Sequence, residues 1–220
     1  MKRYIMILAA GLVAGAALAD TIITPTSVVL TDNGDGNLIE NAGGDAWFNG
    51  SGLSDATIVE NGDTVPAVLP THGYGENFTR MARVRFATGG LAELTFDLGG
   101  TYEVGGVILW NLGLDTHSDR GVENAAISWS SDGINFTSAE TLTFAQGPGT
   151  QQPIAGEEQT LGTSLPGVTH IRMALDNFNA AKTQVAFSEI RMVAVPEPAT
   201  LGLLGAFGGA ILFIRRRLMI

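Results

Sequence analysis

The chain has 220 residues, with 22 acidic against 12 basic side chains and no cysteine. The lack of cysteine excludes disulfides, thiol catalysis and thiolate metal sites. Residues 20–195 hold 21 of the acidic and seven of the basic residues, a net charge of −14, so we expect no nucleic-acid partner. Such a surface suits a solvated protein outside the cytoplasm, or one that binds divalent cations.

Residues 1–19 have the features of a secretory signal peptide. Two basic residues at positions 2 and 3 precede a stretch that is uncharged and mostly apolar. Ala17 and Ala19 place small residues at the two positions that a signal peptidase reads. We therefore expect cleavage before Asp20, and the alternative is a retained N-terminal anchor.

The segment 20–195 has the length of one domain with a sizeable core. Short β-like runs separated by turn residues recur along it, without a convincing helical period, and this spacing predicts an all-β sandwich. Glycine-rich sequence between residues 31 and 79 predicts a functional loop or a local decoration. The expected strands cover residues 22–23, 27–30, 82–86, 92–98, 104–112, 125–130, 141–144, 170–175 and 184–194.

One β-hairpin is predicted from local pattern. Ala125, Ile127 and Trp129 alternate with small or polar residues, which gives this run a single apolar face. The pair Asp132-Gly133 follows, and Asp-Gly favours a tight turn because both positions tolerate positive φ. We expect the return strand to begin at Phe136.

The C-terminal 25 residues combine three signals in a fixed order. A break rich in proline precedes an uncharged, apolar run from 199 to 214, and three arginines follow it. At 1.5 Å per residue the run spans about 24 Å, somewhat short of the ~30 Å hydrocarbon core, but arginine side chains can snorkel. It predicts a single transmembrane helix with a cytoplasmic C-terminus. A buried core helix is the alternative.

The tail resembles the PEP-CTERM sorting signal of bacterial exported proteins. This resemblance implies an exosortase-type membrane enzyme as partner, which cleaves near the Pro-Glu-Pro element after signal peptidase has acted. The helix would then be a transient anchor in the inner membrane, and the product would reach the cell surface or the medium. The matching residues, in segment 196–220 and just before it, are Val195, Pro196, Glu197, Pro198, Arg215, Arg216 and Arg217.

A second resemblance covers residues 91–193. The run Leu94–Gly99, the stretch Arg120–Thr137 with its Ser-Asp-Gly turn, and the strands Thr169–Met173 and Phe187–Met192 resemble discoidin and coagulation-factor C domains. The resemblance implies a galactose-binding-like jelly-roll β-sandwich. That fold binds sugars, lipid headgroups or proteins through loops at one end, and the fold alone does not give the ligand.

In the resembled fold the polar loop at 114–120 would lie at the binding rim, where its side chains could hydrogen-bond sugar hydroxyls. The open alternatives are a solvated loop and, for the arginine, a supporting role. Three aromatic residues in loop-like sequence, Trp47, Tyr74 and Phe78, could stack on a sugar ring. The ligand-binding candidates are Trp47, Tyr74, Asp115, His117, Asp119 and Arg120.

A structural calcium ion is the one cofactor that the second resemblance suggests. Glu189 of the last expected strand would hold it together with an early loop, in which Asp45 is the nearest acid. The acidic run at 32–37 lacks the glutamate that completes an EF-hand, and it favours a turn.

Motifs of enzymes are missing from the sequence: it has no metal-protease pattern, no nucleophile elbow and no phosphate loop. We therefore predict a non-enzymatic, exported and exosortase-processed surface or matrix protein that binds carbohydrate, such as an exopolysaccharide. The alternatives are a purely structural surface protein without a small ligand and a polysaccharide hydrolase.

Overall fold

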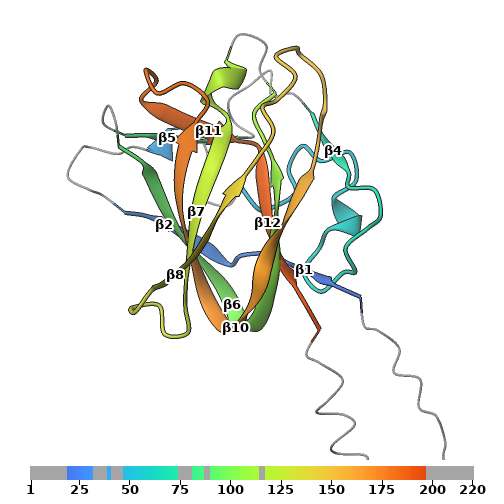
Figure 1. Cartoon of the computed structure of the whole chain (residues 1–220). Coiled ribbons are helices and arrows are strands. Elements are labelled where there is room, and N and C mark those ends of the chain that lie inside the picture. The colour runs from blue at the N-terminus through green and yellow to red at the C-terminus, as the bar shows by residue number, and fades with distance from the viewer. Residues whose placement is uncertain are drawn as a thin grey trace, which may run out of the picture. The chain divides into compact units, whose positions relative to one another are not determined.

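Two long antiparallel strands, β6 (Ala92–Trp110) and β10 (Glu157–Asn177), run through the centre of the computed structural model (Figure 1). The structure describes residues 19–31, 39–40, 47–73, 81–86, 90–113 and 117–196. Within it, Ala19–Pro196 form one compact unit. Apart from two short 3-10 turns, η1 (Ala56–Ile58) and η3 (Ser118–Arg120), the regular structure of the described part is β-strand.

The main sheet has the strand order β1-β12-β6-β10-β7-β8, with β2 also beside β6. A second sheet has the order β11-β5-β3, and β4 pairs with β9. The remaining strands are β1 (Thr21–Ile23), β2 (Ser27–Leu30), β3 (Ile39–Glu40), β4 (Thr71–His72), β5 (Ala82–Arg85), β7 (Val122–Ser130), β8 (Thr137–Thr143), β9 (Ile154–Ala155), β11 (Gln184–Phe187) and β12 (Glu189–Ala194).

The two halves of β6 lie in different surroundings. From Ala92 to Leu98 every second residue is buried, as expected for a strand with one face on a core. From Val104 to Trp110 every residue is buried, so both faces of this half are covered. Gly99 has φ of 68° between the halves, and the pairing of β6 with β10 shifts register there. The main sheet therefore bends over itself and encloses a core.

The core lies between these two parts of the sheet and the sheet β11-β5-β3. Inward side chains of all three parts join one cluster of buried residues, in which Phe96, Val107 and Phe187 represent each part. Burial of a large apolar side chain contributes about 1.5–3 kcal/mol, so this cluster is the main source of stability.

The segment 47–72 covers the outer face of the second half of β6. Ile108 and Trp110 point to that face and pack with Val59, while Leu53 and Leu69 border this smaller cluster. The indole Nε1 of Trp110 donates to the Pro70 carbonyl at 2.6 Å. The glycine-rich stretch expected as a loop or decoration thus includes a structural cover of the sheet.

The predicted all-β sandwich is confirmed, and so is the hairpin, because β7 pairs antiparallel with β8. The expected strands 92–98 and 104–112 are in fact one bent strand. The expected strand 184–194 is two strands that belong to different sheets and separate at Ser188. The run 157–169 escaped prediction because glycine, proline and exposed polar residues hide its periodicity.

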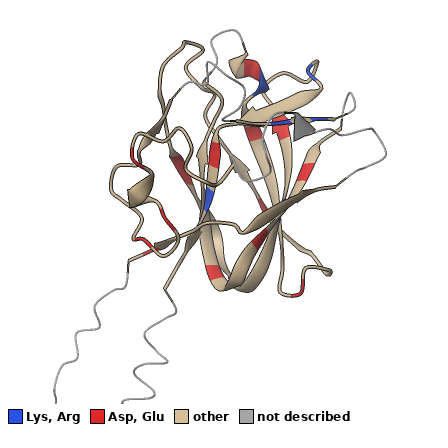
Figure 2. Cartoon of the chain, turned by 180° about the vertical axis from the view of Figure 1, so that it is seen from behind, with Lys and Arg blue, Asp and Glu red and all other residues tan. Residues whose placement is uncertain are grey.

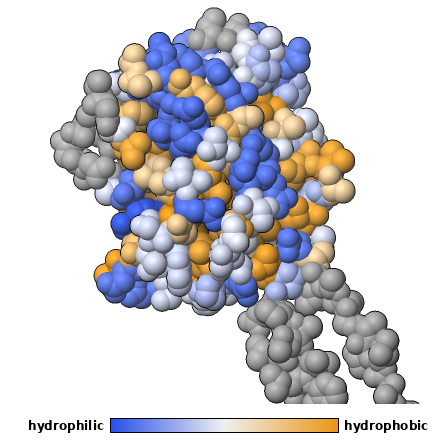
Figure 3. Space-filling model, in the orientation of Figure 1, coloured by the Kyte–Doolittle hydropathy of each residue, from blue (hydrophilic) through white to orange (hydrophobic). Residues whose placement is uncertain are grey.

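Charged and hydrophobic residues are both distributed over the surface. Acidic side chains lie on many strands and loops, while basic ones are few (Figure 2). Figure 3 shows hydrophilic residues over much of the upper front face and hydrophobic ones in scattered patches. No helix within the described ranges is long and apolar enough to cross a membrane, and the run 199–214 lies outside those ranges.

Candidate functional site

A pocket of about 370 Å³ opens where β5 leads into β6 and where β10 turns into β11. These connections lie at the upper end of the molecule, whereas β1 begins and β12 ends on the lower right (Figure 1). We call it the loop-end pocket, and its volume is within the range of small-molecule sites. Its lining residues are Phe86, Gly90, Leu91, Glu123, Asp176, Asn177, Phe178, Ala180 and Lys182.

Asn177, the last residue of β10, fixes the turn that forms one wall of this pocket. Its Nδ2 donates to the carbonyls of Lys182 at 3.3 Å and Gln184 at 2.7 Å. Its Oδ1 accepts from the backbone N–H of Asn179 at 3.0 Å. The backbone N–H of Phe86 donates to the Thr183 carbonyl at 3.0 Å, which joins the opposite wall to the same turn.

The turn is also held by η3. Asp119 Oδ2 accepts from Asn179 Nδ2 at 2.9 Å and lies 3.9 Å from Lys182 Nζ. The Gln184 amide, oriented with its oxygen toward Arg120, accepts from Nε at 3.0 Å and Nη1 at 2.6 Å. The walls are therefore held in place without a ligand, and preorganised walls lower the entropic cost of binding.

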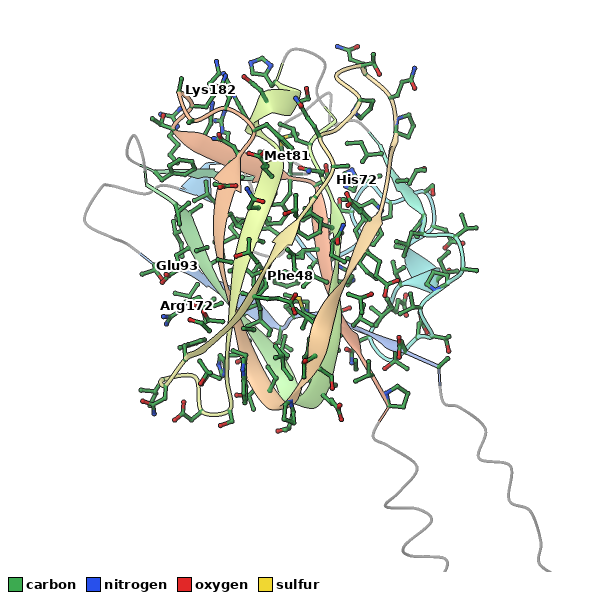
Figure 4. All side chains as sticks on the ribbon, viewed as in Figure 1. Phe48, His72, Met81, Glu93, Arg172 and Lys182 are labelled. Carbon is green, nitrogen blue, oxygen red and sulfur yellow. The ribbon has the colours of Figure 1, made fainter. Side chains whose placement is uncertain are left out.

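The lining combines two kinds of surface. Phe86, Leu91 and Phe178 supply apolar faces, and Leu91 is 43% exposed. Glu123 supplies acceptors, and Lys182, which lies at the upper end in Figure 4, supplies donors. A compound with an apolar ring face and several hydroxyls matches this combination, because the rings take its C–H face and the charged groups take its hydroxyls.

The structure places two of the predicted residues, Asp119 and Arg120, as supports of this site and not in its lining. His117 precedes η3, and its carbonyl accepts from the Arg120 N–H at 2.9 Å. Asp115 and Tyr74 lie outside the described residues.

The structure overturns the prediction that Trp47 is a ligand-binding residue. Its side chain is 0% exposed and packs edge to face on Phe187, with ring centroids 5.9 Å apart. Its carbonyl accepts from the Ile190 N–H at 2.9 Å. The expectation that this ring is open for stacking is therefore wrong, because the ring is fully buried in the core against Phe187.

Sequence reasoning missed the residues that line the pocket. Phe178 and Lys182 stand in a short polar stretch between two expected strands, at 176–183, and an aromatic ring in such a gap was the available signal. Glu123 and Phe86 are brought to the site only by the pairing of β10 with β7 and of β5 with β11. Those pairings are long-range and have no local pattern.

Glu189, the calcium candidate, is 0% exposed at the start of β12 and contacts Nη1 of Arg191. The Gly50 N–H donates to the same carboxylate oxygen at 3.3 Å. Burial raises the pKa of Glu189 to about 7, against the opposing effects of Arg191 and Gly50. Asp45 lies outside the described residues, and within them no three His, Asp or Glu side chains gather as a metal site. Calcium at Glu189 and Asp45 stays a prediction.

The described residues include the two ends of the domain, next to the expected signal peptide and next to the sorting segment. Ala19 and Asp20 are exposed and are the two residues directly before β1. The Val195 N–H donates to the Glu103 carbonyl at 2.9 Å, so the chain leaves the sheet immediately before Pro196. Ala17 and the sorting residues from Glu197 to Arg217 lie outside the described residues.

Several solved structures are similar to the chain. A truncated AlyQ with CBM32 and alginate lyase domains shows 16% identity and a TM-score of 0.48 over 84% of this chain, which spans 35% of that structure. The F5/8 type C domain of a Bacteroides fragilis protein shows 14% identity, a TM-score of 0.40, and coverage of 79% and 100%. The CBM32 of AlyQ in complex with 4,5-unsaturated mannuronic acid shows 16% identity, a TM-score of 0.42, and coverage of 78% and 97%.

The fold described above rests on the strands and their pairing, and not on these distant likenesses. No curated protein matches the chain. The family described as the PEP-CTERM protein-sorting motif matches residues 194–217. This match begins at the last residue of β12, so the sorting segment follows the sandwich without a linker. The chain therefore carries a PEP-CTERM protein-sorting motif at its C-terminal end.

Proposed function

We propose that this protein is an exported, non-catalytic carbohydrate-binding module that an exosortase-type enzyme processes at its PEP-CTERM motif. The observation that carries the proposal is the loop-end pocket, where aromatic rings and charged side chains line a concavity held by strand ends. Signal peptidase and a short stay in the inner membrane belong to the same route. The motif at 194–217 supports this route, and the ligand would be part of an extracellular polysaccharide.

Charge narrows the class of ligand. The segment 20–195 has a net charge of −14, so a polyanionic polysaccharide would meet repulsion over most of the surface. At the pocket, Glu123 and Asp176 add two carboxylates against the one ammonium of Lys182. We therefore expect a neutral sugar to bind better than a uronic acid of the same size.

Binding is tested with the full-length chain in a mild detergent on an array of neutral and acidic glycans. Phe178→Ala should weaken the binding of any hit at least about fivefold, because it removes a ring worth roughly 1 kcal/mol to a stacked sugar. Phe136→Ala is the matched control, since Phe136 lies under Arg172 and away from the pocket. Its affinity should equal that of the wild type.

The array also decides between the candidate functions. Silence for all glycans, with and without calcium, would favour the purely structural surface protein. Shortened glycan products after incubation would favour a hydrolase, and the pocket carboxylates Glu123 and Asp176 would then be the first to replace. Equal losses in the two phenylalanine variants would place binding elsewhere.

A further inference from the structure

A second hollow of about 260 Å³ lies beside η1, between the link after β1 and the side chain of Arg191 in β12. We call it the side pocket. It shares no lining residue with the loop-end pocket. In Figure 4, Phe48 of the side pocket lies near the middle of the molecule and Lys182 of the loop-end pocket lies at the upper end.

Arg191 gives the side pocket a guanidinium donor. The side chain is 3% exposed, and its Nε donates to the Val59 carbonyl at 3.2 Å. Nη1 donates to Glu189 and, at 2.8 Å, to the Ile190 carbonyl. The described chain shows no hydrogen bond from Nη2, and this atom is not among the buried atoms that lack a partner, so its two N–H groups are open to the pocket that Arg191 lines. A ligand carbonyl can accept from this open donor in the place of a water molecule.

The charges around Arg191 argue for a neutral ligand. Glu189 contacts the guanidinium and, with a pKa of about 7, offsets part of its positive charge. Glu60, which is exposed, adds a carboxylate to the lining of the pocket. A carboxylate, phosphate or sulfate would therefore be repelled, whereas a carbonyl oxygen could accept from Nη2 without a charge.

The walls argue for an amide with a methyl group. Phe48 and Ala56 form the apolar part of the lining. Asn61 accepts from the Thr24 N–H through its Oδ1 at 3.1 Å, and it adds a polar side chain to the lining. An acetamido group presents one carbonyl oxygen and one methyl group, which match the donor and the apolar wall, and sugar hydroxyls match the polar rim.

We propose that the side pocket binds the acetamido group of an N-acetylated amino sugar, with the carbonyl oxygen on Arg191 Nη2 and the methyl group against Phe48 and Ala56. This site is separate from the loop-end pocket and does not depend on ligand binding there. The domain would then present two sugar sites of different preference.

The test uses saturation-transfer NMR on the full-length chain in detergent, with N-acetylglucosamine and glucose as probes. These sugars differ at the 2-position, where one has an acetamido group and the other a hydroxyl. We expect saturation of the acetamido methyl group, and at least tenfold weaker signal for glucose. Equal signals for the two sugars, or none for either, would overturn the proposal.

Variants locate the binding. Ala56→Leu fills the side pocket from its partly exposed wall and should remove the signal, while Phe178→Ala in the loop-end pocket should leave it unchanged. Loss of the signal in Phe178→Ala but not in Ala56→Leu would place N-acetylglucosamine in the loop-end pocket and would contradict the proposal. If Ala56→Leu does not fold, as judged by its melting curve, the wild type decides: magnetisation transfer between the methyl group and the Phe48 ring is expected, and its absence contradicts the site.

Discussion

At the scale of single residues, buried polar side chains fix the cover formed by segment 47–72. Trp110 Nε1 donates to Pro70, and Arg191 Nε donates to Val59. His72, 1% exposed, has its Nε2 2.9 Å from the Ser51 carbonyl. Each bond joins a side chain to the backbone of an irregular segment. The cover therefore depends on a few hydrogen bonds besides its apolar contacts.

Trp110→Phe tests one of these bonds. It keeps most of the ring but leaves the buried Pro70 carbonyl without its donor, which should lower the free energy of unfolding by about 1–3 kcal/mol. Chemical denaturation measures this value. Trp129→Phe is the control, because Trp129 is only partly buried in β7, and its cost should be clearly smaller. Equal costs would show that lost ring area, and not the hydrogen bond, sets the effect.

Calcium is the second residue-scale question. If calcium is held at Glu189 and Asp45, chelation with EDTA at constant ionic strength lowers Tm, whereas Arg191 as the only cation at Glu189 would leave Tm within about 1 °C. An ion bound at a hundred times its Kd would add about 2.7 kcal/mol. Its removal would lower Tm by roughly 5–10 °C in a domain of this size. A drop of that extent would show a bound divalent ion, and the absence of that drop from Glu189→Gln would place the ion at Glu189.

At the scale of elements, the turn between β7 and β8 is held by one carboxylate. Asp132 Oδ1 accepts from the backbone N–H groups of Ile134 and Asn135, both at 2.8 Å. Gly133 has φ of 73°, and a Cβ there would lie 2.9 Å from the His170 ring. The turn therefore requires both an acceptor at 132 and glycine at 133.

The pH dependence of this turn follows from its hydrogen bonds. Those from Asn135, and then from Ile134 and Ser130, hold the pKa of Asp132 well below its usual range. Because the folded-state pKa is lowered, the stabilisation is present above about pH 4 and is lost as the pH falls through the lowered pKa. Asp132→Asn should therefore lower Tm at pH 6 and differ less from the wild type at pH 2. Melting curves at the two pH values measure this, and a constant difference would contradict it.

This hairpin was also the part of the fold that the sequence predicted best. Alternation from Ala125 and the Asp-Gly pair are local signals, and local signals suffice for neighbouring strands. The bend in β6 and the length of β10 depend on a partner far along the chain, so no short pattern indicates them. For the same reason Asp119 was found as a polar loop residue, but its role as a support became evident only beside Asn179.

At the scale of the whole molecule, the sandwich and the sorting motif adjoin directly. β12 ends at Ala194, the first residue of the match to the motif. The Val195 N–H is still bonded to the Glu103 carbonyl, so the ordered part of the domain extends up to Pro196. Cleavage further inside would remove part of a buried strand, and we expect cleavage to fall at or after this point.

The intact mass of the mature protein, taken from envelope and medium fractions of cells that produce it, tests the whole route. We expect a product that begins at Asp20 and has lost the apolar run and Arg215–Arg217. Glu103→Ala should be cleaved at the same two positions, so that its mass differs from the wild type only by the substitution, because Val195 bonds to the Glu103 backbone carbonyl and not to its side chain. A mature protein that keeps the arginines would instead be a permanently anchored one.

The pairing of β1 with β12 joins the two ends of the domain, with Thr21 opposite Ala194. A chain that crosses a membrane N-terminus first delivers β1 at the start and β12 at the end. Residues 62–65 can bond to β1 early, but the edge of β1 that faces β12 stays open while about 170 residues follow it. Closing a loop of this length is slow, and an unpaired strand edge can pair with the wrong strand in the meantime. The sheet can be completed only when the Pro-Glu-Pro element itself arrives, so folding and presentation of the cleavage signal are timed to the same moment of export.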